Sequence, residues 1–145
     1  MNSLTSDGLI VLSLLISAVL ATWLWILIKA RTNNGIAELP TYLMFGWGGA
    51  AWTPSIIVID KNNKNKEALI AHERVHQEQQ RKYGWFKFYF KYLTNKQFRF
   101  EMEVEAYKAW LEVLPNDLEK VIWWLLNSYG ISASREEITK LLKDV

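Results

Sequence analysis

His72, Glu73 and His76 form the pattern H-E-x-x-H, and the two histidines are the only ones in the chain. Positions i and i+4 of a helix share a face, so we expect both imidazoles to point into the same space with Glu73 beside them. In this arrangement two histidines bind zinc and the glutamate acts on the metal-bound water. The alternative is a chance meeting on one helix face, which is disfavoured because the chain uses histidine nowhere else.

The residues around this pattern favour a helix. The segment from Lys66 to Tyr83 contains neither proline nor glycine. Asn65 can cap its start, and Gly84 can end it.

A zinc site in a peptidase needs a third protein ligand and an open position. Because the chain has no further histidine and no cysteine, the third ligand must be a carboxylate. The segment 100–114 is expected to be helical and carries four glutamates. At about 100° per residue, Glu103 shares a face with Tyr107 and Trp110, and the other glutamates lie on the opposite face.

A carboxylate among aromatic residues is costly unless it is paired or bound to a metal, so Glu103 is predicted to be the third ligand. The alternative is that Glu103 pairs with Arg99 or a lysine. In the metal reading, Glu73 would take a proton from the zinc-bound water and pass it to the leaving amine. The tetrahedral intermediate needs a second electrophile. Tyr107, one turn beyond Glu103, is the candidate, with Tyr83 and Arg99 as alternatives.

These motifs resemble the gluzincin class of zinc metallopeptidases, in which a glutamate on a later helix completes an H-E-x-x-H helix. The letters AHERVHQEQQ followed by FEMEVEAY are similar to small metallopeptidase-like proteins of bacteria and phages. The resemblance covers about residues 56 to 107. It implies one zinc ion per chain and a zincin-like fold, and it names no substrate.

The segment from Glu103 to Ala106 also resembles the E-x-x-A-D motif of membrane-anchored peptidases. It departs from that motif because Tyr107 replaces the aspartate. In addition, only 26 residues separate His76 from Glu103.

Length and composition limit the other possibilities. The 145 residues suffice for one domain, and the absence of cysteine excludes disulfides and thiolate ligands. The formal net charge is only +2, and no recognisable nucleic-acid-binding module accompanies the basic residues. We therefore expect no nucleic-acid partner.

Residues 8–28 are uncharged and long enough, at about 1.5 Å per residue, to cross a hydrocarbon core of roughly 30 Å. Trp23 and Trp25 would lie near the headgroups, and the positive charges of Lys29 and Arg31 place the following side in the cytoplasm. A cleaved signal peptide is the alternative, but no basic residue precedes the apolar run and no cleavage motif follows. We expect a single-pass anchor, N-out and C-in, over residues 1–30.

Residues 31–40 contain turn formers and are predicted to be a polar linker into a domain that occupies residues 41–145. Glycines divide the segment 41–60 into two extended pieces, and Ile56 to Ile59 is a β-branched run typical of a buried strand. This small sheet could pair with an extended peptide substrate, or it could be a structural hairpin that covers the helix. The two alternatives stay open.

The segment from Trp85 to Leu93 interleaves aromatic residues with Lys87 and Lys91. This pattern suits a membrane surface that bears anionic lipid, and it equally suits a packed helix with snorkelling lysines. Two capping-box patterns follow and predict the last two helices. The first pair is Asn116 with Glu119, and the second is Ser134 with Glu137.

Together these features predict an α+β, mostly helical fold: one N-terminal transmembrane helix and a compact zincin-like domain with a small sheet. The predicted function is that of a membrane-anchored zinc metallopeptidase that hydrolyses peptide bonds. The alternative is an inactive interaction module on the same anchor, stabilised by zinc or free of metal. Because so small a domain has little room for a deep pocket, a protein partner could complete the cleft.

Overall fold

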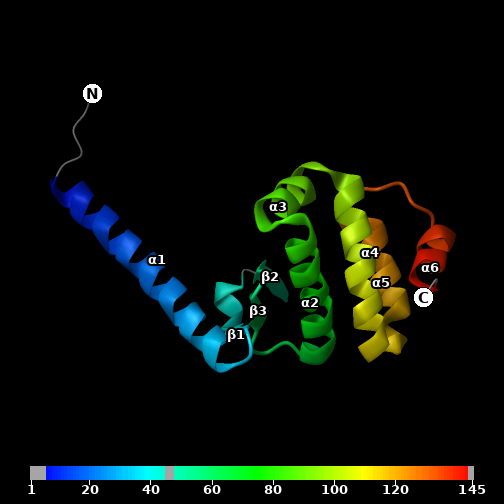
Figure 1. Cartoon of the computed structure of the whole chain (residues 1–145), viewed down its shortest axis with the longest axis horizontal. Helices are drawn as coiled ribbons and strands as arrows, with labels where there is room; N and C mark the ends of the chain where they lie inside the picture. The colour runs from blue at the N-terminus through cyan, green and yellow to red at the C-terminus, as the bar shows by residue number, and fades with distance from the viewer. Residues whose placement is uncertain (1–5, 45–47, 144–145) are drawn as a thin grey trace.

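The computed structural model describes residues 6–44 and 48–143, which form a mostly helical fold with one small sheet (Figure 1). The coarse α+β prediction is therefore confirmed. The helices are α1 (Ser6–Thr32), α2 (Lys66–Tyr83), α3 (Trp85–Thr94), α4 (Lys96–Val113), α5 (Leu118–Ser128) and α6 (Arg135–Lys143). The strands are β1 (Ile36–Leu39), β2 (Gly49–Thr53) and β3 (Ile56–Asp60), and short 3-10 turns cover Thr41–Leu43 and Pro115–Asp117.

The N-terminal helix α1 extends away from the rest of the chain (Figure 1). Within it, Ile10–Arg31 is long and apolar enough to cross a membrane. Its leucines, isoleucines and valines are exposed over most of this length, as expected for side chains that have no protein to pack against.

One face of the last two turns of α1 is buried against the sheet. Ile26 and Ala30 pack with Ala37, Leu39 and Val58 in one apolar cluster. The helix and the sheet therefore share a core.

The predicted linker at residues 31–40 is wrong in part, because residues 36–39 form strand β1. Gly35, at φ +83°, turns the chain out of α1, and its N–H donates to the Ala30 carbonyl at 2.8 Å. The strand then pairs in parallel with β3, burying Ala37 and Leu39 while Glu38 stays exposed. Four residues give too short an alternation to be recognised among turn formers.

The sheet has the strand order β1-β3-β2, with β2 antiparallel to β3. The strand predicted over Ile56 to Ile59 is confirmed as β3, which lies in the centre and is therefore the most buried. Of the two extended pieces expected within residues 41–60, the second contains both β2 and β3. The first begins as a 3-10 turn at Thr41–Leu43, and residues 45–47 lie outside the described part of the chain.

Helix α2 has the predicted bounds, Lys66–Tyr83, and the last predicted helix forms as α6, Arg135–Lys143. The Ser134 capping box forms, because Glu137 N–H donates to Ser134 Oγ at 3.1 Å and the Glu137 carboxylate accepts from Ser134 N–H at 2.7 Å. The Asn116 box is wrong: α5 begins after Asp117, which makes no side-chain cap.

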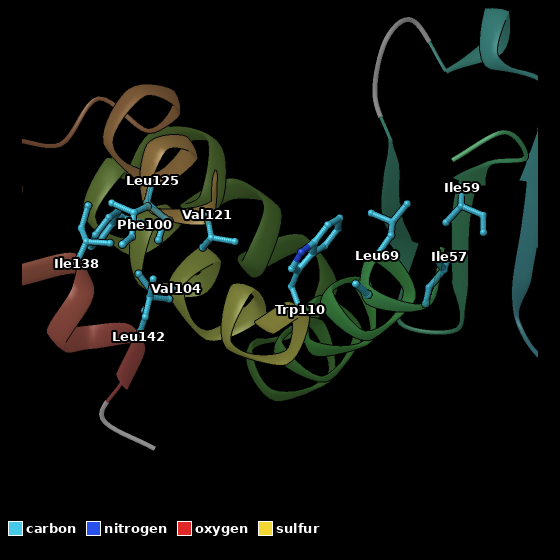
Figure 2. Packing of buried hydrophobic residues seen from close by; sticks show 12 residues of the cluster. Ile57, Ile59, Leu69, Phe100, Val104, Trp110, Val121, Leu125, Ile138 and Leu142 are labelled. Carbon is cyan, nitrogen blue, oxygen red and sulfur yellow. The ribbon is translucent and has the colours of Figure 1, made fainter. Parts of the chain in front are cut away.

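The main core joins α2 and β3 to the helices α4, α5 and α6. Figure 2 shows Trp110 between Leu69 and Ile57 on one side and Val121 on the other. The indole N–H of Trp110 donates to Asp117 at 3.0 Å, so this large side chain is buried without an unpaired donor. The core thus holds α4 against α2.

Replacement of Ile26 by alanine tests whether α1 and the sheet share a core. Ile26 is 1% exposed, so Ile26→Ala should lower the free energy of unfolding in detergent by about 2–5 kcal/mol. The control Leu24→Ala removes a side chain that is 58% exposed on the same helix and should change it by no more than about 0.5 kcal/mol. Equal effects of the two substitutions would contradict the shared core.

Candidate metal centre

Two neighbouring helices bring three potential metal ligands together. His72 and His76 lie one turn apart on α2, and Glu103 faces them from α4. The Nε2 atoms of the histidines are 3.2 Å apart, and each lies near one oxygen of Glu103, at 3.5 Å for His72 and 3.4 Å for His76. One ligand atom from each residue lies within 4.8 Å of the others, so this buried group could hold a metal ion.

The packing of α4 on α2 selects one glutamate from the four on α4. Glu103 is 3% exposed, whereas Glu101, Glu105 and Glu112 lie on the exposed face, as the helical spacing predicts. The alternative pairing with Arg99 does not form in the described structure: the Arg99 guanidinium donates to the Tyr92 carbonyl at 2.9 Å. The partners of Glu103 are the two histidines and two tyrosines.

The Nε2 atoms of His72 and His76 and the carboxylate of Glu103 can each accept a hydrogen bond, and they face one another. Such a buried group of acceptors is stable only with a positive charge at its centre. Burial alone would lower the pKa of His76, but the hydrogen bond and negative charge of Glu103 outweigh it and raise the pKa. Burial, reinforced by the charge of His76, lowers the pKa of His72 to about 3. In the protein alone, the positive charge is therefore the proton on His76 Nε2, which faces the Glu103 carboxylate at 3.4 Å.

A metal ion could replace that proton, and the outer nitrogen of His76 is already arranged for it. His76 Nδ1 lies 2.8 Å from Gln79 Oε1, so Nδ1–H is the donor and Nε2 is the nitrogen that would bind a metal once its proton leaves. Gln79 is itself fixed by its Nε2, which donates to the Met102 carbonyl at 3.0 Å and to Glu105 at 2.9 Å. His72 Nδ1 has no such partner among the described residues.

Glu73 lies beside the two histidines and is 5% exposed. Burial raises its pKa to about 7, although the charge of His76 and a hydrogen bond from the Ala51 backbone oppose the shift. A carboxylate with a pKa near 7 can accept and release a proton at neutral pH. This is the property that a general base requires.

Two tyrosines that the sequence did not indicate contact Glu103. The hydroxyl of Tyr92, on α3, donates to Glu103 Oε1, and that of Tyr129, just after α5, donates to Oε2 at 2.8 Å. They come from segments before and after α4, so no spacing relates them to Glu103. Tyr107, the residue predicted from spacing, lies farther out: its hydroxyl is 3.5 Å from that of Tyr129, and its ring centroid is 4.5 Å from that of His72.

Strand β2 is an edge strand, but its middle is already occupied. The Ala51 carbonyl accepts hydrogen bonds from Gln80 Nε2 and from the Tyr89 hydroxyl, both at 2.6 Å. The Trp52 carbonyl accepts from the indole of Trp85 at 3.1 Å. The geometry therefore favours the hairpin that covers the helix, and it leaves only the beginning of β2 for a peptide to pair with.

A cavity of about 520 Å³ contains the candidate ligands and Glu73. Its size falls in the usual range for small-molecule and peptide-side-chain sites. Its walls come from β2 and from helices α2 to α5, so no single segment of the sequence outlines it. Aromatic side chains on these walls are Trp52, Phe88, Tyr89, Tyr92, Tyr107, Trp110, Trp124 and Tyr129.

The role of Gln79 can be tested directly. Gln79→Leu removes the acceptor that fixes His76, so zinc affinity should fall about 10–100-fold. Titration against a fluorescent chelator measures the affinity. Gln77→Leu is the matched control, because Gln77 is 4% exposed on the same helix and points toward Thr53, to whose carbonyl it donates at 3.4 Å. An equal loss in both variants would mean damage to the fold instead.

In comparisons with protein-family models, with curated proteins and with solved structures, nothing matches this chain. The function must therefore be inferred from the geometry and chemistry of the cavity itself.

Proposed function

We propose that this chain is a membrane-anchored zinc metallopeptidase. The observation that carries the proposal is the buried group of His72, His76 and Glu103, whose ligand atoms lie within 4.8 Å of one another. Glu73 is buried next to this group and shares the same cavity. A purely structural metal site would have no use for such a base and would usually supply a fourth protein ligand.

The donor set suits zinc better than calcium or magnesium. Two imidazole nitrogens and one carboxylate are typical of a catalytic zinc site with an open position, whereas calcium and magnesium prefer oxygen ligands alone. When bound, zinc supplies a Lewis acid and makes water acidic enough to lose a proton near neutral pH. Tyr92 and Tyr129 would hold the Glu103 carboxylate in place by their hydroxyl groups.

Glu73 is proposed to move the proton during peptide hydrolysis. Its carboxylate would accept a proton from the attacking water and deliver it to the nitrogen of the leaving amine. Its burial in the cavity beside the three ligands places it for both steps. Tyr107 remains the proposed hydrogen-bond donor to the carbonyl oxygen of the scissile peptide bond, on which negative charge develops. The neighbouring Tyr129 also lines the cavity and carries a second hydroxyl group there.

The anchor is proposed to be α1, inserted so that the domain faces the cytoplasm. The length and apolar surface of Ile10–Arg31 support the span. Lys29 and Arg31, directly after the apolar run, support the orientation, since basic residues are retained on the cytoplasmic side. A peptide or protein at that membrane face would be the substrate.

Metal analysis tests the ligand set. The purified full chain should contain about one zinc ion per molecule by plasma mass spectrometry, and His76→Ala and Glu103→Gln should each lose it. Glu101→Gln is the control, because Glu101 lies exposed on the same helix and should leave the zinc content unchanged. A wild-type protein that takes up no zinc even after reloading would refute the proposed function.

Substitution of Glu73 separates catalysis from metal binding. With a peptide library from a proteome digest as substrate, Glu73→Gln should keep its zinc and lose cleavage by about 10²–10⁴-fold, because only the base is removed. Mass spectrometry of the products gives the rate. Zinc-loaded wild type that cleaves no better than Glu73→Gln would instead support the inactive zinc-stabilised module.

A further inference from the structure

One face of α3 is apolar and exposed. Phe86, Phe90 and Leu93 occupy positions i, i+4 and i+7, and their side chains are 81%, 70% and 73% exposed. The opposite face is fixed in place, because Phe88 is 2% exposed and packs with Phe98 and Met102. Exposed apolar residues that adjoin on an ordered helix mark an interaction surface.

The surroundings of this face are strongly basic. Residues 81–99 contain six Lys or Arg residues and no acidic one. Arg81, Lys82 and Lys87 are exposed, and Lys87 directly follows Phe86 on α3. A partner that combines an apolar interior with a negatively charged surface fits both properties, and an anionic lipid bilayer is such a partner.

A series of tryptophans connects this surface to α1. The ring of Trp52 packs on that of Trp23 with centroids 4.7 Å apart, and the Trp52 carbonyl accepts from Trp85, the first residue of α3. Trp23 lies about 12 Å along the helix axis from Arg31. The domain therefore contacts α1 as far along as Trp23, where tryptophans typically lie among lipid headgroups. Helix α3 lies on the side of the domain toward which α1 extends (Figure 1).

We propose that Phe86, Phe90 and Leu93 insert into the headgroup region of the anionic bilayer that α1 crosses. This inference rests on the proposed membrane anchor. Phe88, on the opposite side of α3, and Tyr89 line the cavity, so the lipid contact would fix one cavity wall at the membrane surface.

Single-cysteine labelling of the full chain tests this inference, since the chain has no cysteine of its own. Phe90→Cys carries an environment-sensitive fluorophore in vesicles of phosphatidylcholine with phosphatidylglycerol. Its emission should shift to the blue, and nitroxide lipids should quench it more than aqueous iodide does. Trp123→Cys on α5, at a position 60% exposed, should show the reverse.

A label at Leu15→Cys, 64% exposed in the middle of α1, distinguishes the two ways to fail. A Leu15 label quenched by lipid together with a Phe90 label quenched by iodide overturns the α3 contact and leaves the anchor intact. A Leu15 label quenched by iodide overturns the anchor, and the α3 proposal with it.

The charge requirement is tested in the same system. Lys87→Gln should reduce the ratio of lipid-contacting to free α3 about fivefold, because one basic residue at the surface is lost. Lys140→Gln, exposed on α6, should leave the ratio unchanged. Equal protection of the Phe90 label in vesicles without phosphatidylglycerol would overturn the anionic character of the partner.

Discussion

The buried carboxylate of Glu103 is the constraint on which the rest of the structure depends. A negative charge removed from water is stable only among donors or cations, and here two imidazoles and two tyrosine hydroxyls provide them. These four partners come from α2, α3 and the end of α5. The helical part of the domain is thus arranged around a single acidic side chain. Trp110, packed in the main core, holds α4 in position against α2.

The same constraint makes the site receptive to a cation. In the protein alone, a proton on His76 pairs with the ionised Glu103 carboxylate. Their mutual attraction raises the pKa of His76 and lowers that of Glu103 despite burial. A divalent metal would take the place of this proton with little rearrangement, because Gln79 already directs Nε2 of His76 inward. For the proposed chemistry, the bound metal would add the positive charge that the site needs beside Glu73.

The three-stranded sheet connects the apolar helix to this site. Strand β1 packs against the end of α1. Strand β2 contacts α2 through Ala51, whose backbone forms a hydrogen bond with Glu73 and whose carbonyl accepts a second one from Gln80 Nε2. Strand β3, between them, makes the sheet one rigid connector. A domain held in this way cannot turn freely about α1, so the exposed face of α3 keeps a fixed relation to that helix.

The sequence by itself determined the elements whose signals are local. Four-residue spacing placed His72 and His76 on one face, and helical periodicity separated Glu103 from the other glutamates of α4. Asn65 and Gly84 indicated where α2 begins and ends. Only the tertiary structure decided which side chains meet across elements. Tyr92 and Tyr129 reach Glu103 from segments with no fixed spacing to it, and β1 is a strand only because β3 supplies its hydrogen bonds. Such contacts depend on how the helices and strands pack, and packing is a property of the whole chain, which no local pattern contains.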